Sequence, residues 1–233
     1  WSAFDRGFYE VKDVTGKAAQ PVAEAVNVLS CFADNAAVSE EGSLVAVDSE
    51  GRSASEDRSS FDWTYVCPTN SDYREGLLEI VADCVEEHDD VRLDNVEYPG
   101  AGFCHCDRCD QRFAESNIED REAWRASVIT EFVAEVTALV PGRLFLSLRP
   151  DPYPGHLYER SGVDLAALDD YVDEFVVPLY DPSYATTYWL ETIASGFGDE
   201  LDTSLGVELY AVDQEIDDLI DATAAVEPDA DHV

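Results

Sequence analysis

The stretch V-R-L-D-N-V-E-Y-P-G at residues 91–100 is the segment from which the fold can be worked out. It is a short apolar run of strand length, and it ends at the turn-forming pair Pro99-Gly100. Segments with helical periodicity lie on both sides of it, at 71–87 and at 119–140, and Asn70 or Ser71 can cap the first of them. A strand between two such helices predicts β-α-β units and a parallel sheet.

The same alternation of strands and helices continues in both directions along the chain. The other expected strands are 28–32, 43–48, 62–70, 143–152, 174–181, 204–210 and the beginning of one at 230–233, and the other expected helices are 18–26, 164–172, 184–195 and 213–225. About seven such units predict an α/β fold of the (β/α)8 TIM-barrel type rather than an open sheet. We expect one domain over residues 1–233, with a Cys-rich loop insertion at 100–118. The barrel could be incomplete at its first or last strand.

Acidic residues dominate the charge of the chain. There are 51 Asp and Glu residues against 14 Lys and Arg residues, which gives a formal net charge of −37. Nucleic acid is therefore not an expected partner, because phosphate binding needs a cationic surface. No run of about 18 apolar residues predicts a membrane span. No signal peptide is visible, so we expect a location in a salt-rich cytoplasm, or outside the cell if a signal segment precedes Trp1.

Polar and aromatic residues stand where the expected strands end. In a barrel the carboxyl ends of the strands face the active site. Two carboxylates that flank a glycosidic bond can protonate the leaving oxygen and either attack or activate water, and aromatic rings offer flat apolar faces to sugars. The catalytic candidates are Asp94, Glu97 and Glu208, and the substrate-binding candidates are Asp48, Asn95, Arg149, Asp151, Tyr180, Asp181 and Tyr210.

Any single acid could stand at a strand end by chance and have no function, because the chain contains so many acids. Asp94, Glu97 and Glu208 stand in apolar strand sequences, where an acid needs a specific reason. We expect 91–97 to be the fourth strand and 204–210 the seventh, and acids at these two positions are typical of many retaining glycoside hydrolase barrels. Those barrels usually carry Asn-Glu at the fourth strand, whereas this chain has Asp94-Asn95-Val96-Glu97, so either acid could serve. For Arg149, an ion pair with Asp151 or with a barrel acid is the alternative to substrate binding.

A second cluster is the sequence C-H-C-D-R-C at residues 104–109. Three thiolates so close together in a loop suit a tetrahedral structural zinc ion. The expected ligands are Cys104, Cys106, Cys109 and Cys67, with His105 or Cys31 as substitutes for the fourth. A disulfide, a redox dithiol and free thiols remain as alternatives. Cys84, on the apolar face of a helix, is expected to be inert packing, as is Trp189 on a later helix.

Two stretches together resemble a known family: W-T-Y-V-C-P-T-N-S-D-Y-R-E-G-L-L-E-I-V at 63–81 and V-R-L-D-N-V-E-Y-P at 91–99. They are similar to the hypothetical glycosidase-like barrels, a group that includes the hydrolase domain attached to poly-N-acetylglucosamine deacetylases. The Cys-rich stretch is similar to an insert of related barrels, and the likeness covers about residues 44–181. The resemblance implies a TIM-type fold, sugar polymers as substrates and Asp94 as the functional acid of its strand. Glu97 stands where the family has Arg.

The leading hypothesis is therefore a glycoside hydrolase that acts on an oligo- or polysaccharide by paired carboxylates and is adapted to high salt. Glu97 at the family's Arg position favours a second hypothesis, a carbohydrate-binding barrel without activity. A third is a zinc-dependent hydrolase of another bond.

The first testable prediction concerns salt. Lysine is rare, with Lys12 and Lys17 beside twelve arginines, and this composition resembles that of proteins from salt-accumulating archaea. Carboxylates on a chain of this size lie on the order of 14 Å apart, and the Debye length falls from about 8 Å at physiological salt to about 3 Å at 1 M. Repulsion between the acids should therefore vanish at high salt, and the melting temperature should rise steadily with KCl concentration. A melting temperature that is the same at low and molar KCl would contradict this expectation.

Overall fold

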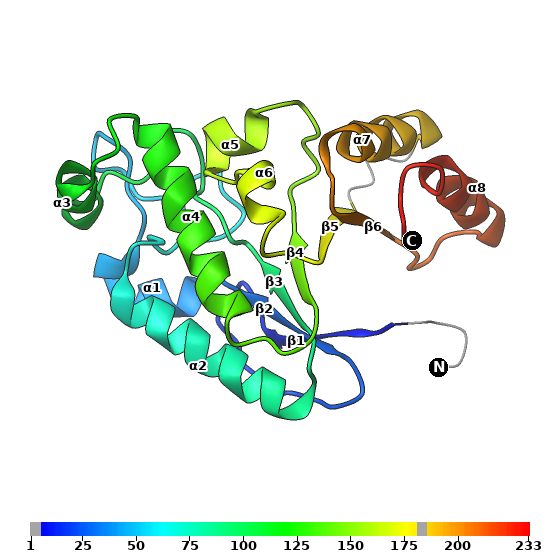
Figure 1. The fold of residues 1–233 in the computed structure, drawn as a ribbon, viewed down its shortest axis with the longest axis horizontal. Coiled ribbons are helices and arrows are strands. Elements are labelled where there is room, and N and C mark those ends of the chain that lie inside the picture. The colour runs from blue at the N-terminus through cyan, green and yellow to red at the C-terminus, as the bar shows by residue number, and fades with distance from the viewer. Residues whose placement is uncertain (1–5, 181–185) are drawn as a thin grey trace.

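The computed structural model describes residues 6–180 and 186–233 and contains one parallel β-sheet flanked by helices (Figure 1). Across the sheet the strands follow the order of the chain, and each neighbouring pair is parallel. They are β1 (Phe8–Lys12), β2 (Val26–Ser30), β3 (Val91–Asp94), β4 (Leu144–Ser147), β5 (Glu174–Leu179) and β6 (Ser204–Leu209). Within the described residues no strand pairing joins β6 to β1, so the barrel is unclosed. The expected α/β barrel, incomplete at its ends, is confirmed.

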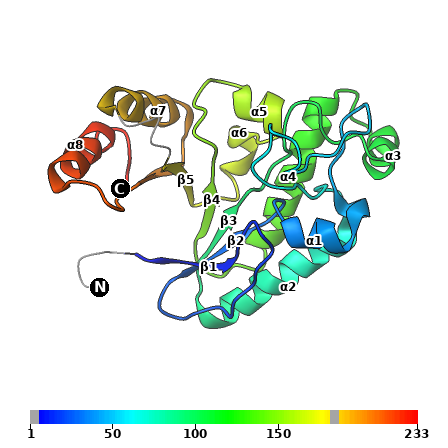
Figure 2. The same ribbon diagram turned by 180° about the vertical axis from the view of Figure 1, so that it is seen from behind.

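Helices follow most of the strands. They are α1 (Asn35–Glu40), η1 (Gly42–Leu44, a 3-10 turn), α2 (Ser71–Glu87), α3 (Asp107–Glu115), α4 (Arg121–Thr137), α5 (His156–Ser161), α6 (Leu165–Leu168), α7 (Thr187–Glu200) and α8 (Ile216–Val226). The two long helices α2 and α4 lie against each other on one side of the sheet, whereas α7 and α8 lie together at its far end (Figures 1 and 2). Each helix of the described residues falls short of the length and apolarity that a bilayer span requires.

Local sequence explains where the two long helices begin and which faces they bury. The side chain of Asn70 accepts a hydrogen bond from the amide of Tyr73 at 2.9 Å and caps α2. Asp120 caps α4 in the same way. The apolar face of α2 is buried at Leu77, Val81 and Cys84, as the helical periodicity predicts, and Cys84 is packing as expected. On α4, the buried face includes Trp124, Val128, Ile129, Phe132, Val133 and Val136.

Side-chain alternation along each strand gives the two faces of the sheet different chemistry. On β3, Val91 and Leu93 belong to the main core beneath the helices, while Arg92 and Asp94 line a cavity on the inner face. The other strands contribute to the same inner lining with Phe8, Glu10, Val28, Ser147, Pro178 and Glu208. Below this polar lining, Val26, Phe145 and Val176 form a separate small apolar cluster. The inner face of the sheet is therefore where polar strand residues are brought together.

Three expected elements are wrong. Residues 43–48 and 62–70 are not sheet strands, because they pair with each other and with the loop after β2 through isolated antiparallel bridges, for example Ala33 with Tyr65 and Val45 with Val66. Residues 18–26 are not a helix either. Pro21 lies in this segment, and the side chain of Asn27 holds it by two hydrogen bonds to the backbone of Val22, at 3.0 and 3.1 Å.

These corrections change the strand count. β1 carries polar and apolar residues without a clear apolar run, and was not expected. With β1 added and two strands removed, the segment at 91–94 becomes the third strand of the described sheet and that at 204–209 the sixth, rather than the fourth and the seventh. At the chain end, His232 forms a single parallel bridge with Gly206 where the beginning of a strand was expected.

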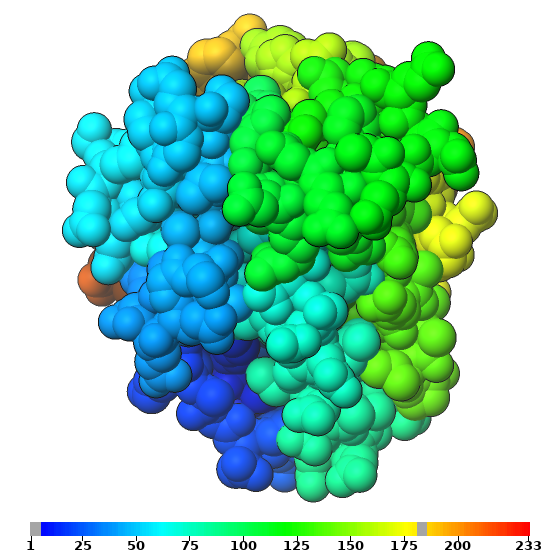
Figure 3. All heavy atoms as spheres, turned by 90° about the vertical axis from the view of Figure 1, so that its left-hand side faces the viewer, coloured from blue at the N-terminus to red at the C-terminus, as the bar shows by residue number. Residues whose placement is uncertain are grey.

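The long connection between β2 and α2 packs against the Cys-rich insertion. Asp48 forms a bridge with Phe103, and the amide of His105 donates to the carbonyl of Val47 at 2.8 Å. Figure 3 shows the two segments in contact on one side of the molecule, in blue to cyan and in green. Residues 43–70, where two strands were expected, instead form a layer of loops over one end of the sheet. We call residues 43–70 the loop layer.

Candidate active site

A cavity of about 430 Å³ opens at the carboxyl ends of the strands. It is lined by inner-face strand residues and by the loops that follow them. Of the residues expected from the sequence, it brings together Asp94, Asn95, Glu97, Arg149, Tyr180 and Glu208. Because a cavity of this size with convergent polar groups is the usual form of a small-molecule site, we take it as the candidate active site.

Arg92 connects acids from two distant strands inside this cavity. Its two terminal nitrogens donate to the two carboxylate oxygens of Glu208, Nη1 to Oε1 and Nη2 to Oε2, the second at 2.9 Å. Its Nε lies 3.3 Å from Oδ1 of Asp94 and donates to the hydroxyl of Ser147 at 2.8 Å. The Ser147 hydroxyl in turn donates to Oδ1 of Asp94. A two-pronged guanidinium–carboxylate contact of this kind fixes both partners in orientation.

The electrostatics of this group follow from burial and charge. Burial of Arg92 disfavours its charged form, but the hydrogen bond to Glu208 and the charge of Asp94 outweigh that effect, so the pKa of Arg92 is raised. The Tyr180 hydroxyl donates to Oε2 of Glu208. Burial and the negative charge of Glu208 raise the pKa of Tyr180, which therefore stays a hydrogen-bond donor at neutral pH.

A second charged group holds the opposite wall of the cavity. Nε of Arg149 donates to Oε1 of Glu97 at 2.6 Å, and its Nη2 donates to the hydroxyl of Tyr65 at 2.7 Å. Burial raises the pKa of Glu97, although the charge of Arg149 opposes the shift. Burial and the charge of Glu97 raise the pKa of Tyr65 to about 12. The Arg149 ion pair that was the alternative to substrate binding exists, and its partner is Glu97.

The three candidate catalytic acids differ in their access to the cavity. The side chains of Asp94 and Glu208 are 27% and 22% exposed, whereas that of Glu97 is 8% exposed. A substrate in the cavity can therefore reach Asp94 and Glu208 more readily than Glu97. The roles of all three stay predictions.

Three of the expected substrate-binding residues do not line this cavity, and a fourth cannot be placed in or out of it. Asp48 belongs to the loop layer, where it accepts from Nε of Arg52 at 2.7 Å and from nearby amides. Asp151 pairs with Arg160 at 2.8 Å, beside a neighbouring cavity. Tyr210 is half exposed beyond the end of β6, and Asp181 lies outside the described residues. Asp48 and Asp151 pair with Arg52 and Arg160, which do not line the cavity, and Tyr210 lies past the last residue of β6.

Some residues that line the cavity were not expected from the sequence. Arg92, Ser147 and Glu10 point into the cavity from β3, β4 and β1, and Trp63 and Tyr65 reach it from the loop layer. Arg92 had a signal, because a cation in the apolar run V-R-L-D needs a buried partner. Glu10 adds one more acid to the cavity lining, near Asp94. Burial and the charges of Asp13 and Asp94 raise the pKa of Glu10.

The four expected metal ligands meet in the structure. The sulfur atoms of Cys67, Cys104, Cys106 and Cys109 all lie within 4.8 Å of one another, with Cys67 3.3 Å from Cys109 and 3.6 Å from Cys106. A disulfide needs sulfurs about 2.05 Å apart, so the four thiols are free. Hydrogen bonds from Cys104 and Cys109 lower the pKa of Cys106. The substitutes are placed elsewhere: the Cys31 thiol lies 3.7 Å from the carbonyl of Leu29, and His105 lies 3.6 Å from Asp110.

Comparison with known proteins supports the fold. No family model and no curated protein matches the chain in sequence. The PgaB (BpsB) glycoside hydrolase domain from Bordetella bronchiseptica is similar in structure, with a TM-score of 0.60 at 11% identity over 88% of this chain and 75% of that chain. Alpha-L-fucosidase isoenzyme 2 from Paenibacillus thiaminolyticus gives a TM-score of 0.53 at 12% identity, over 94% of this chain and 43% of that chain. At these identities the likeness concerns the fold alone, and the glycosidase-like fold that the resemblance implied is confirmed.

The contact between Glu97 and Arg149 leads to a prediction about pH. The substitution Arg149→Met leaves Glu97 buried without its partner, so its pKa should rise further. Loss of a partner in a buried pair costs about 3–5 kcal/mol, and because Arg149 is half exposed we expect about 2 kcal/mol at neutral pH. A carboxyl group whose pKa is raised on folding favours the folded state when protonated, so the difference from the unsubstituted protein should shrink as pH falls through that pKa.

This difference can be measured by urea unfolding in molar KCl over a range of pH. The matched control is Arg160→Met, which removes an exposed partner of Asp151 and should change the free energy of unfolding little. A loss for Arg149→Met that is the same at acidic and neutral pH would show that Glu97 is not the group responsible.

Proposed function

We propose that this protein is a glycoside hydrolase that cleaves an oligo- or polysaccharide, with Asp94 and Glu208 as its pair of catalytic carboxylates. The observation that carries the proposal is the joint attachment of these two partly exposed acids, from β3 and β6, to the single guanidinium of Arg92 inside one cavity. Paired carboxylates that face a common cavity are the usual machinery for hydrolysis of a glycosidic bond. The fold shared with glycoside hydrolase structures is compatible with it.

The contacts assign different tasks to the two acids. Both oxygens of Glu208 accept hydrogen bonds from Arg92, which fixes the orientation of this group in the cavity. Glu208 would therefore act as the carboxylate that attacks the anomeric carbon or activates water. The contacts of Asp94 with Ser147 and with Arg92 both involve Oδ1, so Oδ2 is the oxygen that would carry a proton to the leaving sugar oxygen. If Glu208 attacks, a covalent bond to the sugar forms while Asp94 gives its proton to the leaving oxygen; Asp94 then takes a proton from the water that hydrolyses this bond. If Glu208 instead activates water, it takes the water proton in the same step in which Asp94 protonates the leaving oxygen.

Glu97 would have a positioning role in this scheme. It is nearly buried and accepts from Nε of Arg149, whose Nη2 donates to the Tyr65 hydroxyl and whose side chain lines the cavity. Arg149 could then donate hydrogen bonds to sugar hydroxyls. Tyr180 and Asn95, from the same lining, are the other proposed contacts to substrate.

One observation favours a carbohydrate-binding barrel without activity as the second candidate. Arg92 and Tyr180 together occupy the Glu208 carboxylate, and a carboxylate held this tightly is a weaker nucleophile. This reading predicts that sugars bind and are not turned over. A zinc-dependent hydrolase is not supported by the cysteine group, since four sulfur ligands leave no open position for water.

The catalytic assignment predicts the effect of two isosteric substitutions. Asp94→Asn removes the proton donor and Glu208→Gln removes the carboxylate, so each should lower kcat at least about 100-fold on a glycan that the protein cleaves. Glu115→Gln, an exposed acid of α3 that lines neither this cavity nor a neighbouring one, should retain activity and serves as the control. Activity can be screened on glycan libraries in molar KCl by release of reducing ends. Full activity of both variants would remove this mechanism, and binding without turnover by the unsubstituted protein would favour the second candidate.

We further propose that the cysteine group binds a structural zinc ion. The donor set supports this, because four sulfurs about 2.3 Å from a tetrahedral ion would lie about 3.8 Å apart, close to the separations of 3.3 and 3.6 Å between thiols that are now free. Cys67 comes from the loop layer and the other three from the insertion, so the ion would hold these two segments together.

The zinc proposal predicts a loss of metal and stability on substitution. Cys109→Ser should lower the zinc content of the purified protein from one ion per chain and reduce its melting temperature, because metal binding contributes directly to folding. A strong chelator should destabilise the unsubstituted protein and leave Cys109→Ser unaffected. Cys84→Ser, which changes a buried thiol outside the group, should keep the ion. Absence of metal in protein purified without chelator would contradict the proposal.

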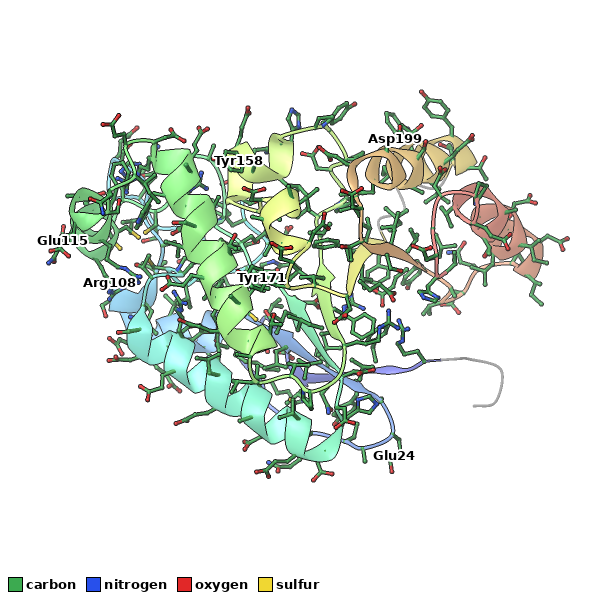
Figure 4. The ribbon with its side chains drawn as sticks, viewed as in Figure 1. Glu24, Arg108, Glu115, Tyr158, Tyr171 and Asp199 are labelled. Carbon is green, nitrogen blue, oxygen red and sulfur yellow. The ribbon has the colours of Figure 1, made fainter. Side chains whose placement is uncertain are left out.

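The acidic surface supports one last part of the proposal, activity at high salt. Figure 4 shows Glu24, Glu115 and Asp199 on widely separated parts of the surface, with their side chains directed outward. Repulsion is thus spread over the whole molecule rather than confined to one patch.

A further inference from the structure

A second cavity, of about 660 Å³, lies beside the candidate active site. The two cavities share Arg149, Pro150 and Leu157 in their linings, so they lie side by side with these residues between them. The second is formed mainly by the loop after β4, by α5 and by α7. A long ligand bound in the first cavity has the second as the adjoining hollow for its continuation.

Aromatic rings are exposed at this second cavity. Trp189 was expected from the sequence to be core, but its side chain is 45% exposed and lines the cavity from α7. Tyr153 is 61% exposed on the opposite loop, and its ring packs on that of His156 with centroids 5.2 Å apart. Large rings left open to solvent at the edge of a cavity indicate a binding surface, because their burial by a ligand is favourable.

Hydrogen-bond donors accompany these rings. Arg149 stands at the junction of the two cavities, and Arg160 and His156 both contact the carboxylate of Asp151 at 2.8 and 3.2 Å. The chain has 14 Lys and Arg residues in all, so two arginines at one cavity are a local concentration. Flat apolar faces next to polar donors match a sugar ring, which has apolar C–H faces and a rim of hydroxyls.

We propose that the second cavity is a binding site for the continuing chain of an oligosaccharide whose scissile bond lies between Asp94 and Glu208. Trp189 stacks on one of its sugar rings. This inference rests on the proposed function and deepens it, because it assigns extended oligosaccharides, rather than mono- or disaccharides, as the substrate class.

The test measures how chain length affects binding. Disaccharides and hexasaccharides of glucose, xylose, galactose and N-acetylglucosamine are titrated calorimetrically in molar KCl into the Asp94→Asn protein, which keeps the cavity and should not degrade them. We expect at least one hexasaccharide to bind at least about tenfold more tightly than its disaccharide. Adding Trp189→Ala should remove about tenfold in affinity for that hexasaccharide, the factor to which about 1.4 kcal/mol corresponds. Trp189→Phe should recover most of it.

Tyr188→Ala is the matched control. Tyr188 is the neighbouring exposed ring on α7, in edge contact with Trp189 at 5.4 Å between centroids, and it is not part of the cavity lining. It should leave hexasaccharide affinity unchanged. The inference is overturned if no hexasaccharide binds, if affinity does not depend on chain length, or if Trp189→Ala and Tyr188→Ala have equal effects. Trp189-dependent binding of a hexasaccharide that the unsubstituted protein never cleaves would instead refute the proposed hydrolysis and leave this site in place.

Discussion

The contact on which the candidate site depends is the hydrogen-bonded pair between Arg92 and Glu208. It joins the third strand to the sixth across the inside of a barrel that does not close. Two strands that are not neighbours in the sheet are thereby held at a fixed distance by a guanidinium and a carboxylate. Because Arg92 also contacts Asp94, the same side chain that links the strands also sets the position of both candidate catalytic acids.

Scarce basic residues are used in a consistent way in this chain. Beneath the candidate site, Glu174 is almost fully buried and pairs with Arg6 at 3.1 Å and Arg143 at 2.8 Å. Above it, Arg92 and Arg149 pair with acids of the cavity. Asp94, Glu97, Glu174 and Glu208 thus have arginine partners, since a buried charge without one is costly.

The loop layer contributes Asp62, Trp63 and Tyr65 to the wall of the candidate active site, and the Cys-rich insertion packs against this layer. Tyr65 lies two positions before Cys67 and outside the strands of the sheet. Its hydroxyl accepts a hydrogen bond from Arg149. Of the four clustered sulfur atoms, one comes from the loop layer and three come from the Cys-rich insertion. A group that holds the sulfurs together would therefore also keep Tyr65, Arg149 and Glu97 in place, although these residues lie far apart in the sequence.

The sequence by itself determined the repeating strand-helix order, the two long capped helices, the acidic surface and the identity of the four clustered cysteines. These depend on local periodicity, cap residues and spacing, which are properties of short stretches. Only the tertiary structure decided which polar residues share a cavity. In it Arg92 contacts Glu208, whereas Asp48 and Asp151 pair with arginines elsewhere. Trp189 is exposed at a second cavity. Such contacts depend on how loops cross the ends of the strands, and short-range sequence patterns contain no information about distances between separate strands.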